Sequence, residues 1–246
     1  MTVRRNFNGG KRRVGEWKQQ AIPFPNTWGG KRKGAGRKRL GARSNVPHRV
    51  RPAHGAGNPV LVTLRAGFRP LRSQHVFPTV CLALAAATRR SGSFRIVQFS
   101  VQWDHVHLMV EARDERALSR GLQGVAIRIA RSVNALVMRR GRFWADRWHG
   151  RELTSPRQVR NALVYVLANF RKHEKGRVAA GVDAFSSAGR FDGWSGFTAG
   201  AVLPRAGPAV HGAMARWVVV SESKTWLARV GWRRSGLVRV DEAPKG

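Results

Sequence analysis

The chain has 246 residues, 42% of them hydrophobic, and a formal net charge of +33. A compact body with that charge repels itself unless a polyanion neutralises it, so nucleic acid is the first partner to expect, ahead of an anionic membrane surface or an RNA-rich particle. A GC-rich genome, which inflates arginine, would account for only part of the excess. The single cysteine, Cys81, excludes an intrachain disulfide and a cysteine-based zinc site.

The sequence offers no apolar stretch near its first residues and no run of roughly 18 apolar residues. We therefore expect a cytoplasmic, nucleoid-associated protein that does not contact a membrane.

Residues 1–58 are basic and glycine-rich, with Glu16 as their only acid. Such a segment has no periodicity to bury, so we expect a disordered tail in the free protein. Its cations would lie against phosphates and add salt-sensitive, sequence-independent affinity. The alternative is a solvated tail without a specific role. The residues assigned to phosphate contact are Lys31, Arg32, Lys33, Arg37, Lys38 and Arg39.

Residues 59–176 carry the periodic segments of a folded domain. An alternating run predicts a strand over 60–65, and an alanine- and leucine-rich segment predicts a helix over about 73–90. Two further alternating runs, 94–102 and 105–112, predict a β-hairpin turning at Trp103 and Asp104.

A second helix is predicted to begin after Asp114, its N-cap, and to end at Gly141, because apolar residues recur between them at spacings of four and three. Residues 142–153 predict a fourth strand with a bend at Gly150. The order β-α-β-β-α-β is typical of a ferredoxin-like split-βαβ sandwich, an α+β fold whose central antiparallel sheet carries helices on one face and leaves the other open for a ligand.

One more helix is predicted after the fourth strand. Ser155 is its N-cap, Pro156 takes the first helical position, and Gln158 completes a capping box. Beyond it the pattern loosens, with loop chemistry over 185–197. We expect residues 177–246 to form an irregular C-terminal extension that folds back on the core, because its tryptophans need burial.

Two histidines stand two residues apart in the second strand of the hairpin. Side chains at i and i+2 leave the same face of a strand, so His105 and His107 should lie side by side. Such a pair either shares one divalent metal ion or is simply two histidines in a sheet.

The only tyrosine of the chain, Tyr165, falls in the last predicted helix. With residues at 100° intervals and Leu163 at the centre of the apolar stripe, Tyr165 comes out about 200° and Asn169 about 240° away. Tyr165 therefore points away from the stripe, which weakens a packing role, although a surface tyrosine covering the helix stays open. Asn169, one turn later, places its carboxamide next to the phenol.

These residue types suit phosphodiester cleavage, which needs a nucleophile in line with phosphorus and a group that holds charge on the non-bridging oxygens. A tyrosine oxygen can attack and keep the 5′-phosphate covalently. One Mg²⁺ or Mn²⁺ ion held by His105, His107 and Asn169 would act as the Lewis acid. Zinc is the conservative alternative for two histidines, but no third strong ligand is close in sequence.

The segments DHVHLMVEA and FWADRWHGRELTSPRQVRNALVYVLANFRKH together resemble the HUH single-tyrosine transposases, within them the REP-associated tyrosine transposase branch, over roughly residues 59–173. The resemblance implies a ferredoxin-like core, His105 and His107 as the HUH pair, Tyr165 as the nucleophile and Asn169 as the third ligand. It also implies nicking of single-stranded DNA near imperfect hairpins, with a 5′-phosphotyrosine intermediate and a free 3′-OH. Trp148 departs from the family, whose members commonly carry Tyr or Phe there.

Several neighbouring residues are assigned secondary roles. Contact with nucleic acid is expected from Arg147, His149 and Lys172, with a structural role for His149 equally open. Asp104, Glu111 and Asp146 are placed to touch the metal or a ligand imidazole, although a turn or surface role is the simpler reading of each.

The function predicted from the sequence is a metal-dependent single-stranded DNA endonuclease and strand transferase. The alternative is a catalytically inactive, basic nucleic-acid-binding protein on the same fold, which binds by charge and aromatic stacking. Whether the chain acts alone or as a homodimer is left open.

Overall fold

The computed structural model describes residues 53–90, 92–172, 181–195, 210, 212 and 219–244. The six cations predicted to contact phosphate between Lys31 and Arg39, and most of the predicted tail, lie outside these residues.

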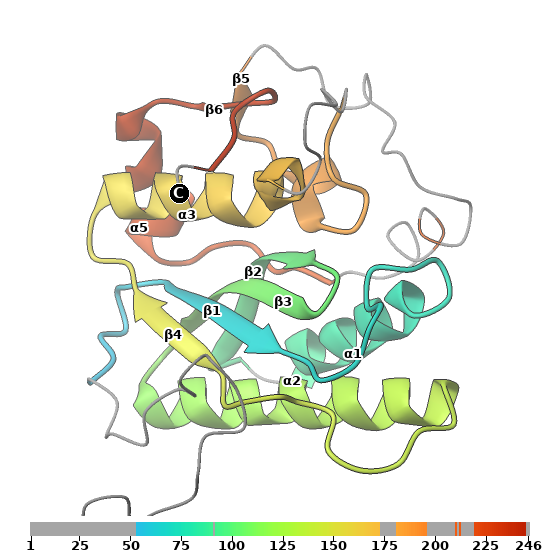
Figure 1. The fold of residues 1–246 in the computed structure, drawn as a ribbon. Helices are drawn as coiled ribbons and strands as arrows, with labels where there is room; N and C mark the ends of the chain where they lie inside the picture. Colours follow the sequence, from blue (N-terminus) through green and yellow to red (C-terminus); the bar gives the residue numbers. More distant parts are fainter. Residues whose placement is uncertain are drawn as a thin grey trace, which may run out of the picture. The chain divides into compact units, whose positions relative to one another are not determined.

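A four-stranded antiparallel sheet in the order β2-β3-β1-β4 forms the centre of the fold (Figure 1). The predicted α+β, ferredoxin-like sandwich with a central antiparallel sheet is therefore confirmed. The strands are β1 (Val60–Arg65), β2 (Phe94–Val101), β3 (His105–Ala112) and β4 (His149–Glu152).

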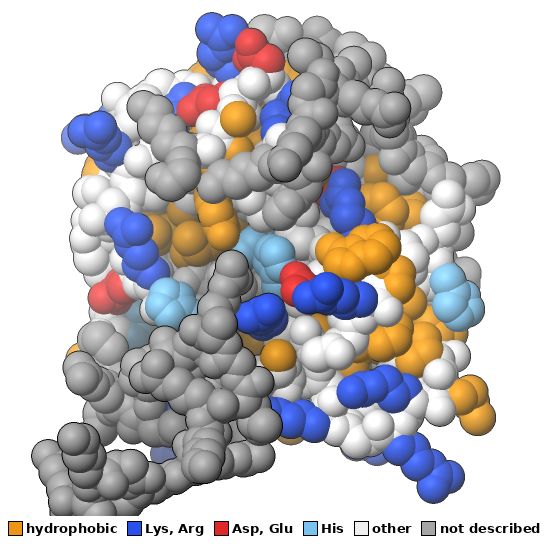
Figure 2. Space-filling model, viewed as in Figure 1, with side chains coloured by type: hydrophobic (Ala, Val, Ile, Leu, Met, Phe, Trp, Pro, Cys, Tyr) orange, Lys and Arg blue, Asp and Glu red, His pale blue; other side chains and the backbone are white. Residues whose placement is uncertain are grey.

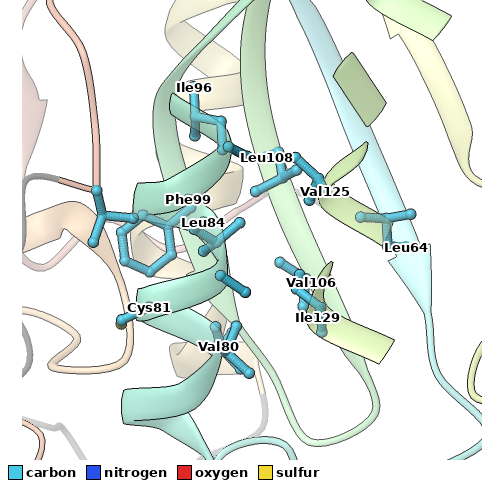
Figure 3. Close-up of a cluster of buried hydrophobic side chains, with 14 of the residues drawn as sticks. Leu64, Val80, Cys81, Leu84, Ile96, Phe99, Val106, Leu108, Val125 and Ile129 are labelled. Carbon is cyan, nitrogen blue, oxygen red and sulfur yellow. The ribbon is translucent and has the colours of Figure 1, made fainter. Parts of the chain in front are cut away.

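Two helices, α1 (Phe77–Arg90) and α2 (Glu115–Leu136), cover one face of the sheet. Figure 3 shows their core, in which Leu84 of α1, Ile129 of α2 and Phe99 of β2 are completely buried. Burying each such side chain stabilises the fold by about 1.5–3 kcal/mol. At Gly121 a Cβ atom would lie 2.2 Å from the Phe94 ring, so only glycine lets α2 pack this closely on β2.

Two predicted boundaries of this layer were wrong. Asp114 does cap α2, accepting the Ala117 N–H at 2.7 Å, but the helix ends at Leu136 and not at Gly141, because Met138 already takes a left-handed conformation with φ 51°. Helix α1 begins at Phe77, later than predicted, since Ser73 holds the preceding residues in a turn by accepting the Val76 N–H on its hydroxyl.

The predicted fourth strand is shorter than expected. Only His149–Glu152 pairs with β1 in a ladder, and Trp144 forms an isolated bridge with Ala66. The Arg142 guanidinium donates to the carbonyl oxygens of Trp144 and Ala145 at 2.7 and 2.8 Å, which keeps these carbonyls away from a sheet ladder.

Helix α3 (Pro156–Ala168) covers the second face of the sheet, the face that an antiparallel sheet of this kind can leave open for a ligand. Ser155 caps it as predicted, accepting the Gln158 N–H at 3.3 Å, but the Gln158 side chain accepts from Thr154 N, one residue before the N-cap. Met109 of β3 packs among the apolar side chains of α3. The 3-10 helix η1 (Asn169–Lys172) continues the chain.

Short elements after residue 181 pack against α3 and β2. They are η2 (Ser187–Arg190), β5 (Trp194–Ser195), α5 (Trp226–Arg229), η3 (Gly231–Ser235) and β6 (Val238–Arg239). The sequence predicted only loop over 185–197, but Ser186 caps η2 and the Trp194 indole N–H donates to the Ala188 carbonyl at 3.0 Å.

Glu111 joins this C-terminal part to the sheet. Its buried carboxylate accepts from the backbone N–H groups of Lys224 and Thr225 at 2.9 and 3.0 Å, from the Thr225 hydroxyl at 2.8 Å and from Arg95 at 3.1 Å. Glu111 is thus neither a surface acid nor a neighbour of the histidines.

None of the helices in the described ranges combines the length and apolarity that crossing a bilayer requires.

Candidate active site and nucleic-acid groove

His105 and His107 lie side by side on β3, on the face of the sheet that α3 covers. Their ring centroids are 4.5 Å apart. His107 is fully buried, and the His105 side chain is 22% exposed. The spacing of two residues in a central strand thus produces the predicted pairing of imidazoles.

Each imidazole has a hydrogen-bond partner at Nδ1. Asp104 Oδ1 lies 2.7 Å from His105 Nδ1, and Thr63 Oγ1 lies 3.0 Å from His107 Nδ1. A histidine that binds a metal through one ring nitrogen usually has its other nitrogen held in this way, which fixes the tautomer and the ring orientation. Nε2 is therefore the nitrogen through which either ring would bind a metal.

Asp104 also organises two cations beside the pair. Its Oδ2 lies 3.1 Å from the Arg69 guanidinium and 3.9 Å from that of Arg65. Burial alone would raise the pKa of the Asp104 carboxyl, but the hydrogen bond to His105 and the nearby guanidiniums outweigh it and hold the pKa below its ordinary value. The carboxylate therefore stays ionised at neutral pH.

Tyr165 of α3 lies against the histidines. Its ring centroid is 4.7 Å from that of His107, in an edge-to-face arrangement. The side chain is half-buried, and this burial raises the pKa of the phenol. Tyr165 is off the apolar stripe as the wheel predicted, but it faces the sheet because α3 is buried on two sides.

Asn169 is the C-cap of α3 and the first residue of η1, one turn after Tyr165, and it is buried. No group of three or more His, Cys, Asp or Glu side chains among the described residues is arranged to hold a metal ion. Further ligands for a metal at the histidine pair would therefore come from an amide oxygen, from water or from a phosphate oxygen of a substrate. Two imidazoles with anchored Nδ1 atoms and an amide oxygen fit Mn²⁺ and, less readily, Mg²⁺.

A groove of about 770 Å³ opens beside Tyr165, between α3 and the β1-β4 edge of the sheet. His149 and Arg151 of β4 and Arg157 of α3 line it and are exposed. Thr63, which contacts His107, lines the same groove. The groove thus holds basic side chains together with the tyrosine and with Thr63, the hydrogen-bond partner of His107.

The other predicted contacts with nucleic acid are dispersed. Arg147 lines a separate depression of about 460 Å³ with Asp146, so neither residue lines the groove. Lys172 is the last residue of η1. Of these predicted residues, the structure brings only His149 into the groove with Tyr165.

Sequence reasoning missed three residues at this site. Thr63 carries no local signal, because its role depends on the register that pairs it with His107 across β1 and β3. Arg151 and Arg157 flank the predicted cap of α3, but the general excess of arginine hides them. Alternation in β4 places Arg151 on the same face as His149, and this pattern alone was readable beforehand.

Comparisons with known proteins add one structural similarity. No protein-family model and no curated protein matches the chain. Among the solved structures that match is one described as a REP-associated tyrosine transposase bound to a REP hairpin, with 16% sequence identity and a TM-score of 0.47. The match covers 58% of this chain and 84% of that one.

Proposed function

We propose that the chain is a metal-dependent endonuclease and strand transferase that nicks single-stranded DNA near hairpins and forms a 5′-phosphotyrosine on Tyr165. The observation that carries the proposal is the contact of Tyr165 with His107, 4.7 Å between ring centroids, beside the His105–His107 pair. The chain's only tyrosine thus contacts the histidine pair on one side and lines a groove with basic side chains on the other.

In the proposed reaction, the Tyr165 oxygen attacks the phosphorus and the bond from phosphorus to the 3′-oxygen breaks. The phenol proton passes to solvent, and the departing oxygen takes up a proton to become the 3′-OH. The covalent phosphotyrosine preserves the phosphodiester energy, so attack by a 3′-OH reverses the step and joins strands.

His105, His107 and Asn169 would hold the Mg²⁺ or Mn²⁺ ion, which when bound supplies positive charge to the non-bridging oxygens of the scissile phosphate. Asp104 and Thr63 keep the two imidazoles oriented through Nδ1. His149, Arg151 and Arg157 would bind phosphates on either side of the nick.

The test is incubation of the protein with labelled hairpin-bearing single-stranded oligonucleotides and Mn²⁺, followed by denaturing electrophoresis. We expect a covalent protein–DNA adduct that is absent with EDTA and in Tyr165→Phe. Because the chain has no other tyrosine, no second phenol can replace the missing one. Tight binding without an adduct across many hairpins would contradict the proposal and favour the inactive binding protein.

A further inference from the structure

We propose that Trp103 is a stacking platform for an unpaired base of single-stranded DNA, next to the histidine pair. The inference rests on the proposed function for the identity of the ligand. The stacking itself is a separate property of the hairpin turn between β2 and β3.

The large apolar side chain of Trp103 is exposed to water, which is energetically unfavourable. It is 55% exposed, although it lies one residue before Asp104, whose carboxylate holds His105. Bases of single-stranded DNA stack on exposed aromatic faces irrespective of sequence, because every base has a π-face. An unstacked nucleobase is therefore a ligand that this indole can accept.

The turn that carries Trp103 is anchored on both sides. The Trp103 carbonyl accepts the Leu71 N–H at 2.9 Å, and the Asp104 carbonyl accepts the Ala66 N–H at 2.7 Å. Gln102, on the other side of Trp103, is buried and donates its N–H to the His105 carbonyl at 2.8 Å. The backbone thus holds the indole at the surface, and a ligand meets a site that is already formed.

Charge around Trp103 suits a nucleotide. Arg65 and Arg69 share the one carboxylate of Asp104, which leaves this corner with a positive balance. Their side chains are 49% and 59% exposed, so phosphates on either side of a stacked base can reach them. Figure 2 shows basic, acidic and histidine side chains next to hydrophobic ones in the middle of the visible face.

Trp226 provides a matched control. It is 51% exposed, close to the value for Trp103, but it belongs to α5, and the Arg234 guanidinium carbon lies 5.1 Å from the centroid of its ring. Trp226 is therefore exposed to solvent, but one face of its ring is covered by an arginine side chain and is not available to a base.

The experiment measures the affinity of the full chain for single-stranded oligonucleotides by fluorescence anisotropy, in EDTA and in a Tyr165→Phe background so that no cleavage intervenes. We expect Trp103→Ala to weaken binding by about 5- to 150-fold, the range for loss of one stacked base. Trp103→Phe should retain most of the affinity, and Trp226→Ala should bind like the parent.

Abasic substitution, one nucleotide at a time, then locates the base. One abasic position should weaken binding to the parent by the factor seen for Trp103→Ala, and should weaken Trp103→Ala no further. Equal affinities of Trp103→Ala and parent, an equal loss in Trp226→Ala, or additive losses at every abasic position would each overturn the inference. Because these measurements need no adduct, their failure is distinguishable from failure of the nuclease proposal.

Discussion

At the scale of single residues, the orientation of the two imidazoles depends on the side chains that hold their Nδ1 atoms. Asp104 and Thr63 occupy the Nδ1 positions, and without them each ring could rotate or change tautomer. The affinity of the proposed metal site should therefore depend on these two neighbours.

We predict that Asp104→Asn weakens Mn²⁺ binding by about 10- to 100-fold without unfolding the protein, because the amide holds the His105 tautomer less well than the carboxylate does. Isothermal titration calorimetry without DNA measures the effect. The control is Asp192→Asn, which removes an exposed acid paired with Arg233 at 3.0 Å and should leave Mn²⁺ affinity unchanged. Equal affinities of the two variants would contradict this role.

At the same scale, the sequence predicted the positions of the main site residues but not the hydrogen bonds that hold them. The spacing of His105 and His107 predicted their common face, and the helical wheel placed Tyr165 off the apolar stripe. Neither pattern contains the pairing of Thr63 with His107, because strand register is a tertiary property. Asp104 was visible as a neighbour of His105, but only the fold shows which atom of the imidazole it contacts.

At the scale of elements, the β-hairpin and the capped helices were predictable because alternation and caps are local signals. The position of α3 on the second face of the sheet was not predictable. Periodicity shows that one face of a helix is buried, but it does not show which other element covers that face. The same reason hid Glu111, whose partners Lys224 and Thr225 lie more than a hundred residues away.

Glu111→Ala should destabilise the fold by about 3–5 kcal/mol, because it leaves the largely buried Arg95 and two backbone N–H groups without their acceptor. Urea denaturation measures this change. Glu115→Ala, which removes an exposed carboxylate from the first turn of α2, should change stability by about 0.5 kcal/mol or less. Comparable losses in the two variants would show that Glu111 does not anchor the C-terminal segment.

The pairing of Arg160 with Glu242 predicts a pH dependence. The hydrogen bonds from Arg160, at 2.8 Å to each carboxylate oxygen, hold the pKa of Glu242 below its ordinary value of 4.5. A carboxyl whose pKa is lowered by folding stabilises the protein above its unfolded pKa and loses this contribution as pH falls through the folded pKa. The stabilisation should therefore be complete at pH 7 and decline progressively as the pH falls below about 4.5.

Glu242→Gln should accordingly lower the free energy of unfolding by about 1 kcal/mol at pH 7, a value reduced for partial exposure of the pair. Thermal unfolding at pH 7 and at pH 3.5 compares the variant with the parent. The melting temperatures should differ at pH 7, and the difference should be smaller at pH 3.5. An equal difference at both values would mean that the ion pair contributes nothing.

At the scale of the whole molecule, the charge of +33 is expected to give strong nonspecific binding to nucleic acid, so the contribution of the groove must be separated from it. Replacing Arg151 and Arg157 together by alanine should reduce the slope of log affinity for single-stranded DNA against log salt by about 1.4, roughly 0.7 per lost phosphate contact. Arg229→Ala, on the exposed side of α5, should leave the slope unchanged. An equal reduction of the slope per removed charge in all variants would show that binding depends on net charge alone and not on the groove.

If Tyr165 and the histidine pair form one reacting site, mass spectrometry of the protein after reaction with hairpin DNA and Mn²⁺ should detect the covalent product. Trypsin should release the peptide from Asn161 to Arg171 with the 5′-phosphate of the cleaved strand bonded to Tyr165. The account predicts this modification in the parent and its absence in Tyr165→Phe and in a His105→Ala/His107→Ala double variant that remains folded. A nucleotide bonded to any other residue, or an adduct that survives loss of both histidines, would contradict it.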